Sequence, residues 1–226
     1  MASSETFDFR GPAGRLEAIL MLPERPPVAA AVVCHAHPLH GGMMHFKVVF
    51  RAAKALQSAG LAVLRFNFRG VGRSEGVHDH GRGEPEDARA ALSEMQDRFP
   101  GLPLVLGGFS FGSAAALCVA ARDARVRAVF ALGYHRQGNL SFRGTPAGQV
   151  PGNPPGLHQP RLFVQGENDE FGSGEAMRVR VAPLPPPREI VVVSGADHFF
   201  DGHLDALQGA IADWAEARPW DFAAPA

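Results

Sequence analysis

A serine flanked by glycines follows an apolar run typical of a buried strand. The segment GGFSFGS at 107–113 places Ser110 in the pattern G-x-S-x-G, and an alanine-rich run comes next. One interpretation is that the glycines only let a strand turn into a helix. The other is that they also avoid backbone collisions on a tight turn that presents the serine Oγ. We favour the second interpretation, so the pattern predicts Ser110 as a nucleophile.

A histidine that could serve as its base follows the last predicted strand. A serine hydroxyl is a weak nucleophile at neutral pH and needs a base within hydrogen-bond reach. His198 lies in the segment GADHFF, directly after the strand expected at Glu189–Ser194. Imidazole titrates near neutral pH and can take a proton and return it to a leaving group. An ordinary loop histidine is the alternative, but this position favours the base.

A carboxylate is needed to hold that histidine in one tautomer. The strand expected at Arg161–Gln165 ends in GENDE, which supplies Glu167, Asp169 and Glu170. The spacing from the strand end favours Asp169, and a solvated acidic loop is the alternative. Asp197 is a poorer candidate because neighbouring side chains on an extended segment diverge from the adjacent histidine.

Acyl transfer also needs N–H donors directed at the developing oxyanion. The backbone N–H of Phe111, at the start of the predicted helix, is one candidate donor. The segment HAHPLHGG at 35–42 follows the first buried strand, and we assign the second donor to the amide of His37. Pro38 has no N–H to donate. The side chains of His35 and His40 are expected to be structural.

The same three histidines suggest a competing metal site. His35, His37 and His40 have the spacing H-x-H-x-x-H, but Leu39 occupies the position where a metallo-β-lactamase-type motif has aspartate. A zinc site also needs ligands from later loops. The later histidines that could nominally complete it are His45, His78 and His80. We expect neither a metal nor another cofactor.

The elements that must position these residues alternate between strand and helix. An edge hairpin is expected at 6–22, before strands at Val28–Cys34, Leu61–Phe68, Leu104–Gly107, Val126–Leu132, Arg161–Gln165 and Glu189–Ser194. Helices are expected near 46–56, 84–99, 111–121, 172–181 and 204–214. This order predicts an α/β fold with a mostly parallel sheet covered by helices on both faces. Ligands bind beyond the carboxyl ends of such strands, where the candidate residues lie.

Length and composition limit the class of protein. The 226 residues are 46% hydrophobic and 20% charged, with a net charge of -1, which predicts one globular domain spanning 1–226. This charge balance does not favour nucleic acid or an anionic membrane as a partner. The first residues lack a signal-peptide pattern, and Cys34 and Cys118 lie in apolar runs, so we expect a cytoplasmic protein. The oligomeric state cannot be predicted.

Apolar residues near the strand ends indicate the class of substrate. The predicted substrate-binding residues are Leu39, Met43, Phe109, Tyr134, Phe171 and Phe199. Aromatic residues beside a buried turn also pack into cores, so part of this set could be structural. An apolar wall favours small, uncharged esters with a short acyl or aryl group.

Five segments in this order carry a family resemblance: HAHPLHGG, FNFRGVGRSEG, GGFSFGS, GENDE and GADHFF. They resemble the α/β-hydrolase superfamily, and in particular its small, cap-less serine hydrolases, loosely called dienelactone-hydrolase-like. The resemblance runs from Phe7 to Trp214. It implies an eight-stranded, mostly parallel sheet, a triad of Ser110, Asp169 and His198, and cofactor-free hydrolysis of carboxylic esters.

The departures from that family are also informative. Dienelactone hydrolases carry a cysteine at the turn, so Ser110 argues against dienelactone as the substrate. Many relatives have aspartate where Asn67 stands, and we assign Asn67 no chemical role. The segment 133–160 lies where relatives often insert a cap but has no amphipathic helix, so an irregular loop and an open site are expected. A non-catalytic member of the same fold that binds a small ligand remains an alternative.

Overall fold

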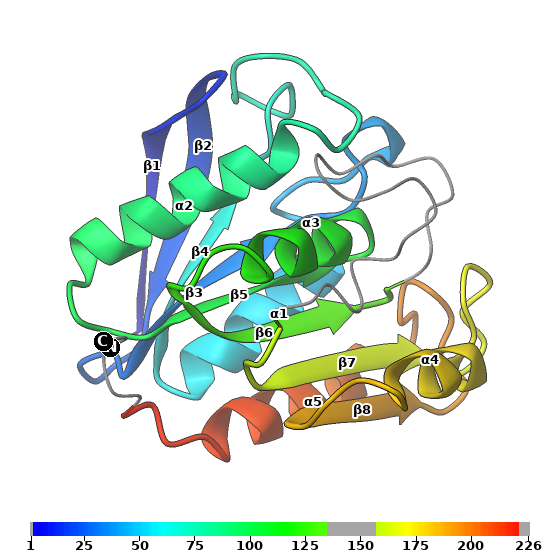
Figure 1. Ribbon diagram of the computed structural model, residues 1–226. Coiled ribbons are helices and arrows are strands. Elements are labelled where there is room, and N and C mark those ends of the chain that lie inside the picture. Colours follow the sequence, from blue (N-terminus) through cyan, green and yellow to red (C-terminus); the bar gives the residue numbers. More distant parts are fainter. Residues whose placement is uncertain (1, 135–156, 222–226) are drawn as a thin grey trace.

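The computed structural model describes residues 2–134 and 157–221, and an eight-stranded sheet runs through them (Figure 1). The strand order is β1-β2-β4-β3-β5-β6-β7-β8. The bounds are β1 Ser3–Gly11, β2 Gly14–Leu22, β3 Ala29–Cys34, β4 Leu61–Phe66, β5 Leu104–Phe109, β6 Val126–Leu132, β7 Arg161–Gly166 and β8 Arg188–Val193. Strands β1 and β2 pair antiparallel, as do β2 and β4, and every later pair is parallel. The predicted sheet and its edge hairpin are confirmed.

Helices cover both faces of this sheet. Their bounds are α1 Lys47–Ser58, α2 Glu84–Arg98, α3 Phe111–Ala120, α4 Gly174–Val181 and α5 Leu204–Glu216, with a short 3-10 helix, η1, at Pro38–His40. Helices α1 and α5 pack in one hydrophobic cluster, and α2, α3 and α4 in the other, as the layers in Figure 1 show. The described residues therefore form an α/β sandwich without a separate large cap over the strand ends.

Strand β3 shows why the centre of the sheet is parallel. All six of its side chains are buried, and they alternate between the two clusters: Ala30, Val32 and Cys34 face α2 and α3, while the other three face α1. A strand covered on both faces needs the continuous apolar sequence AAAVVC. Both cysteines of the chain are buried, and neither forms a disulfide bond.

Several element ends differ from the sequence-based prediction. Strand β4 ends at Phe66, and Asn67 N after it still donates to Glu17 O of the neighbouring β2. Strand β5 continues to Phe109, directly before Ser110. Helix α4 begins at Gly174 because the Ser173 hydroxyl accepts a hydrogen bond from Ala176 N as its N-cap. Most of the predicted irregular segment 133–160 lies outside the described residues.

Within residues 2–134 and 157–221, every helix is too short or too polar to cross a bilayer. The predicted single domain over 1–226 stays a prediction.

Candidate active site

Ser110 lies on a strained turn between β5 and α3. Its φ of 55° and ψ of -113° are an unfavourable combination for a residue with a side chain, and such strain is concentrated at functional sites. A Cβ on Gly108 would lie 2.7 Å from Cys34 O, and one on Gly112 would lie 2.4 Å from the same atom. The glycines of the G-x-S-x-G pattern are therefore required for the close approach of β3, as the sequence predicted.

A second serine fastens this turn to the neighbouring strand. The Ser113 hydroxyl lies 2.6 Å from Gly108 O and 2.8 Å from Leu132 O, and it accepts a hydrogen bond from Leu132 N at 3.0 Å. Ser110 N also donates to Leu132 O, at 2.8 Å. Sequence reasoning missed Ser113, although a lone hydroxyl at the start of an apolar helix was a usable signal.

The three predicted triad residues meet at the carboxyl ends of β5, β7 and β8. His198 Nε2 lies 3.1 Å from Ser110 Oγ, and His198 Nδ1 lies 2.7 Å from Asp169 Oδ2. The three residues are 7%, 3% and 3% exposed in the order Ser110, Asp169, His198. An ionised carboxylate only accepts hydrogen bonds, so Nδ1 carries the proton and Nε2 can accept one from the serine hydroxyl. This arrangement can activate Ser110 as a nucleophile.

The carboxylate of Asp169 is held by two further donors. Phe171 N donates to Oδ1 at 2.9 Å, and Gln165 Nε2 donates to Oδ2 at 2.7 Å. Glu167 instead binds Ser194 Oγ and Gly195 N, and Glu170 is exposed. The structure thus brings Asp169, and neither of the nearby glutamates, to His198.

The loop that carries His198 has its own supports. Asp197 Oδ1 accepts hydrogen bonds from Phe199 N and Asp201 N, both at 3.0 Å, so Asp197 organises the loop rather than binding the imidazole. Phe200 has a φ of 55° and a wholly buried side chain that anchors the loop in the core. The imidazole ring also packs against Phe171, with ring centroids 4.7 Å apart.

The loop expected to supply the second oxyanion donor lies beside the first turn of α3. The ring of His37 packs edge-on against that of Phe111, with centroids 5.2 Å apart. His37 Nδ1 accepts a hydrogen bond from Leu39 N and so caps η1. Burial, followed by the imidazoles of His40 and His78, lowers the pKa of His37 to about 4. The loop adjoins the helix N-terminus as expected, and the oxyanion roles of the His37 and Phe111 amides stay predictions.

The side chains of His35 and Asn67 hold the loop that carries His37 in place. His35 Nδ1 lies 2.7 Å from Ala36 O, and its Nε2 accepts a hydrogen bond from Phe68 N at 3.0 Å. Burial lowers the pKa of His35 to about 4, so the ring is neutral and structural. Asn67 Oδ1 accepts a hydrogen bond from Met44 N at 2.8 Å, a positioning contact that sequence reasoning missed.

This geometry does not support the competing metal site. Both ring nitrogens of His35 are engaged, and its ring packs on Phe68, whereas His37 and His40 stack on each other with centroids 4.4 Å apart. Among residues 2–134 and 157–221, no three histidine, cysteine, aspartate or glutamate side chains are arranged to hold a metal ion.

The predicted apolar wall is divided between surface and core. Leu39, Met43, Phe171 and Phe199 are exposed. Phe109 and Tyr134 are buried, and the Phe109 ring lies 5.0 Å from the His198 ring. Phe109 and Tyr134 are therefore part of the core beneath the site, and their role in binding substrate stays a prediction.

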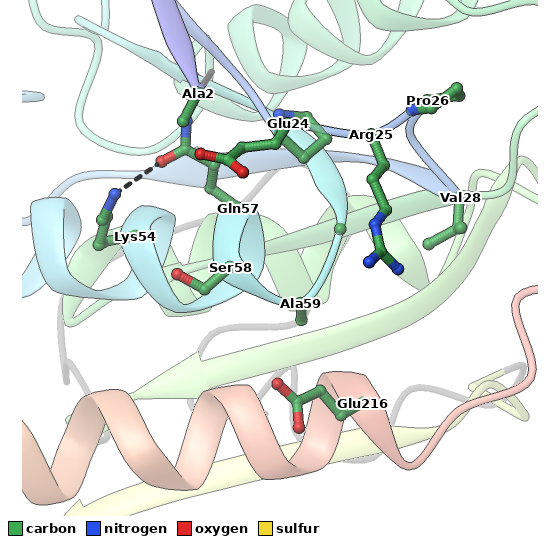
Figure 2. Close-up of a pocket in the computed structure, with 12 residues that line it drawn as sticks. Ala2, Glu24, Arg25, Pro26, Val28, Lys54, Gln57, Ser58, Ala59 and Glu216 are labelled. Atoms are coloured by element: carbon green, nitrogen blue, oxygen red, sulfur yellow. Dashed lines mark hydrogen bonds between the residues drawn. The ribbon is translucent and has the colours of Figure 1, made fainter.

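A separate cavity of about 580 Å³, whose lining Figure 2 shows, includes none of the triad residues. It is lined by the segment 23–28, the end of α1, Ala2 and Glu216. Its charged side chains, Glu24, Arg25, Lys54 and Glu216, include both signs. The cavity lies at the amino ends of the parallel strands, whereas ligands of such folds bind at the carboxyl ends. We assign it no chemistry.

Comparisons with known proteins agree with this fold. An uncharacterized protein of Rickettsia prowazekii is 34% identical over 215 residues, which cover 91% of this chain and 86% of that protein. An alpha-beta serine hydrolase homologue from Coxiella burnetii is 36% identical, with a TM-score of 0.80 and coverage of 92% and 96%. A serine hydrolase without a lid from Xanthomonas campestris is 34% identical, with a TM-score of 0.82 and coverage of 99% and 97%. Residues 29–206 match the family model of the alpha/beta hydrolase domain, and the chain therefore belongs to the alpha/beta hydrolase family.

Proposed function

We propose that the protein is a serine hydrolase that cleaves small, uncharged carboxylic esters through an acyl-enzyme. The observation that carries this proposal is the aligned chain of contacts from Ser110 through His198 to Asp169, with distances of 3.1 Å and 2.7 Å. A hydroxyl, an imidazole and a carboxylate in this order, together with N–H donors for the oxyanion, support acyl transfer without a cofactor.

In the first step, Ser110 Oγ attacks the carbonyl carbon while His198 Nε2 takes the hydroxyl proton. The negative charge that develops on the carbonyl oxygen is stabilised by the amides of Phe111 and His37. Asp169 stabilises the imidazolium that forms, because its carboxylate lies 2.7 Å from His198 Nδ1. His198 then returns the proton to the departing alcohol, which leaves an acyl group on Ser110.

In the second step, water replaces the alcohol. His198 takes a proton from the water molecule as it attacks the acyl carbon, and the amides again stabilise the oxyanion. Collapse of this intermediate releases the carboxylic acid and restores the Ser110 hydroxyl with the proton held by His198.

The side chains that surround the triad support an apolar substrate. Exposed Phe171 and Phe199 pack against the His198 ring, with centroids 4.7 Å and 5.2 Å away. Leu39 and Met43 are exposed on the loop that carries His37. These four side chains offer contact to a short acyl or aryl group. Two buried cysteines without a disulfide bond are compatible with our further proposal that the enzyme works in the cytoplasm.

The proposal is tested with p-nitrophenyl esters graded by acyl length and by aryl content. We expect a pre-steady-state burst of about one p-nitrophenol per enzyme with the best substrate, because the acyl-enzyme accumulates. Activity should be unchanged in EDTA, which separates this reaction from a metal-dependent hydrolase. Binding of an ester without any turnover would overturn the proposal in favour of a non-catalytic binding protein.

A further inference from the structure

We propose that Gln165 is a positioning residue of this site, and that its amide fixes the carboxylate that orients His198. This inference rests on the proposed function, since it gives Gln165 a role in the reaction of the triad. Gln165 is the penultimate residue of β7, its side chain is wholly buried, and it lies four positions before Asp169. Gln165 Nε2 donates to Asp169 Oδ2 at 2.7 Å, the same oxygen that lies 2.7 Å from His198 Nδ1.

The orientation of the Gln165 amide is forced by its surroundings. The amide group has two hydrogens, and both are used, because Nε2 lies 2.7 Å from Asp169 Oδ2 and 2.7 Å from Gly172 O. A flipped amide would place Oε1 against these two acceptors. In the actual orientation, Oε1 is buried without a hydrogen-bond partner among residues 2–134 and 157–221. The fold thus tolerates an unsatisfied oxygen while the NH₂ group faces the triad carboxylate.

The effect on Asp169 is to fix both carboxylate oxygens. Oδ1 accepts from Phe171 N, and Oδ2 accepts from both Gln165 Nε2 and His198 Nδ1. Rotation of the carboxylate about its Cβ–Cγ bond would break all three hydrogen bonds. An ionised carboxylate can only accept hydrogen bonds. An accepting Oδ2 requires His198 to carry its proton on Nδ1, which leaves Nε2 to act on Ser110.

A purely structural role is the alternative, because the contact with Gly172 O also closes the turn after β7. The two roles differ in what a variant changes. Loss of a turn contact lowers the free energy of unfolding but leaves the folded enzyme as active as before. Loss of a positioning contact lowers kcat in the folded enzyme while KM is nearly unchanged, because substrate does not touch Gln165.

The first experiment compares Gln165→Met with the wild type and with Gln57→Met. Gln57 is a matched control, because it is also buried and its amide donates to a backbone oxygen, Leu22 O, at 2.8 Å. We expect Gln165→Met to lower kcat about tenfold, with KM within about twofold, because a displaced catalytic group slows chemistry more than binding. Gln57→Met should lose stability but keep its kcat.

A second variant, Gln165→Glu, tests the role through pH. The new carboxyl would lie about 3 Å from Asp169 Oδ2, and two carboxyls at that distance cannot both ionise without strong repulsion. The kcat of Gln165→Glu relative to the wild type should therefore fall as the pH rises and the pair loses its shared proton. If Gln165 had a purely structural role, the relative kcat of Gln165→Glu would not depend on pH in this way.

A proton NMR spectrum of the resting enzyme supplies a readout that does not need substrate. The hydrogen-bonded Nδ1 proton of His198 should resonate far downfield in the wild type and in Gln57→Met, and should shift or broaden in Gln165→Met. Wild-type kcat and an unchanged resonance in Gln165→Met would overturn the inference while the esterase proposal stands. If Gln165→Met does not fold, a pH-independent ratio of kcat for Gln165→Glu overturns it instead. A wild type without esterase activity would remove the proposed function, and the resonance would still report the contact.

Discussion

Two pairs of histidine and carboxylate lie at the carboxyl ends of the strands, and they differ in what surrounds them. His198 Nδ1 lies 2.7 Å from Asp169 Oδ2, and His78 Nδ1 lies 2.8 Å from Glu84 Oε1. Both carboxylates are buried. Only His198 has a hydroxyl at its other nitrogen, whereas neither ring nitrogen of His78 has a partner with hydrogen-bond geometry among residues 2–134 and 157–221.

The two carboxylates also face different groups. Asp169 is aligned on His198 by Gln165 and Phe171 N. Glu84 stands in the first turn of α2 and accepts hydrogen bonds from Asp79 N and Gly81 N, at 2.7 Å and 2.9 Å. The close contact with His78 is therefore a by-product of a loop held to a helix N-terminus. A short nitrogen–oxygen distance alone does not make a catalytic pair; alignment and the group at the second nitrogen do.

The largest effect that would separate the two pairs is expected from Ser110→Ala. Without the hydroxyl there is nothing for His198 to activate, so kcat for a p-nitrophenyl ester should fall by about a millionfold. Thermal unfolding should change little, because alanine and serine carry the same Cβ at the strained φ of 55°. Substantial turnover in this variant would mean that Ser110 is not the nucleophile.

The next effect comes from the two carboxylates themselves. Asp169→Asn should lower kcat by about ten-thousandfold, because the amide can donate to His198 Nδ1 and so favours the wrong tautomer. Glu84→Gln should keep kcat within about twofold but lower the free energy of unfolding by about 1–3 kcal/mol, because one buried N–H loses its acceptor. Urea denaturation and steady-state kinetics on both variants check this contrast.

The same contrast would be broken by the opposite pattern. If Glu84→Gln lost more activity than Asp169→Asn, the catalytic pair would be His78 and Glu84. Glu170→Gln serves as a further control, since Glu170 is an exposed neighbour of Asp169 and its replacement should leave both activity and stability unchanged.

His35 holds the loops beside the site, so its effect should appear in the free energy of unfolding and not in the turnover rate. Burial lowers the pKa of His35 to about 4, below the value of about 6.5 expected in the unfolded chain. Between these two pH values the unfolded state binds more protons than the folded state. The contribution of His35 to the free energy of unfolding is therefore fully present above pH 6.5 and is lost as the pH falls towards 4. For His35 the loss amounts to about 3 kcal/mol.

Urea denaturation at pH 4.5 and pH 7.5 measures this loss. Glutamine does not titrate in this range. The difference in the free energy of unfolding between the two pH values should therefore be smaller in His35→Gln than in the wild type. An identical difference in wild type and variant would show that His35 is not buried in its neutral form.

The smallest effect is expected from Phe171, an apolar residue beside the catalytic pair of His198 and Asp169. Phe171→Ala should lower the preference for an aryl-acyl ester over acetate by about tenfold in kcat/KM, since Phe171 is 54% exposed and packs on His198. Val179→Ala, a change at an exposed apolar residue of α4, is the control and should not alter the preference. An unchanged preference in Phe171→Ala would remove Phe171 from the substrate-binding set.

The sequence was most informative where a residue's role depends on local chemistry. The glycines around Ser110, the order of the three triad residues and the apolar run of β3 were sufficient to predict the strained turn, the meeting of the triad and the parallel sheet. Asp169 could be chosen over Glu167 because its distance from the strand end sets where its side chain points.

Contacts that depend on how loops pack could not be predicted from the sequence. Gln165 and Ser113 act through hydrogen bonds whose partners are fixed only when β6, β7 and the catalytic loops are in place. Which of the aromatic residues near Ser110 belong to the core could also not be predicted: alternation along β5 directs the Phe109 side chain into the core. The pairing of His78 with Glu84 carried no sequence signal, because neither residue directly follows a strand in the sequence.

Covalent labelling with a fluorophosphonate tests the central claim, that Ser110 is activated by His198, most directly. Intact-mass measurement should show one adduct per chain in the wild type, peptide mapping should place it on Ser110, and labelling of His198→Ala should be slower by orders of magnitude. An unlabelled wild type, an adduct on another residue such as Ser113, or equal labelling rates in the two proteins would contradict the account.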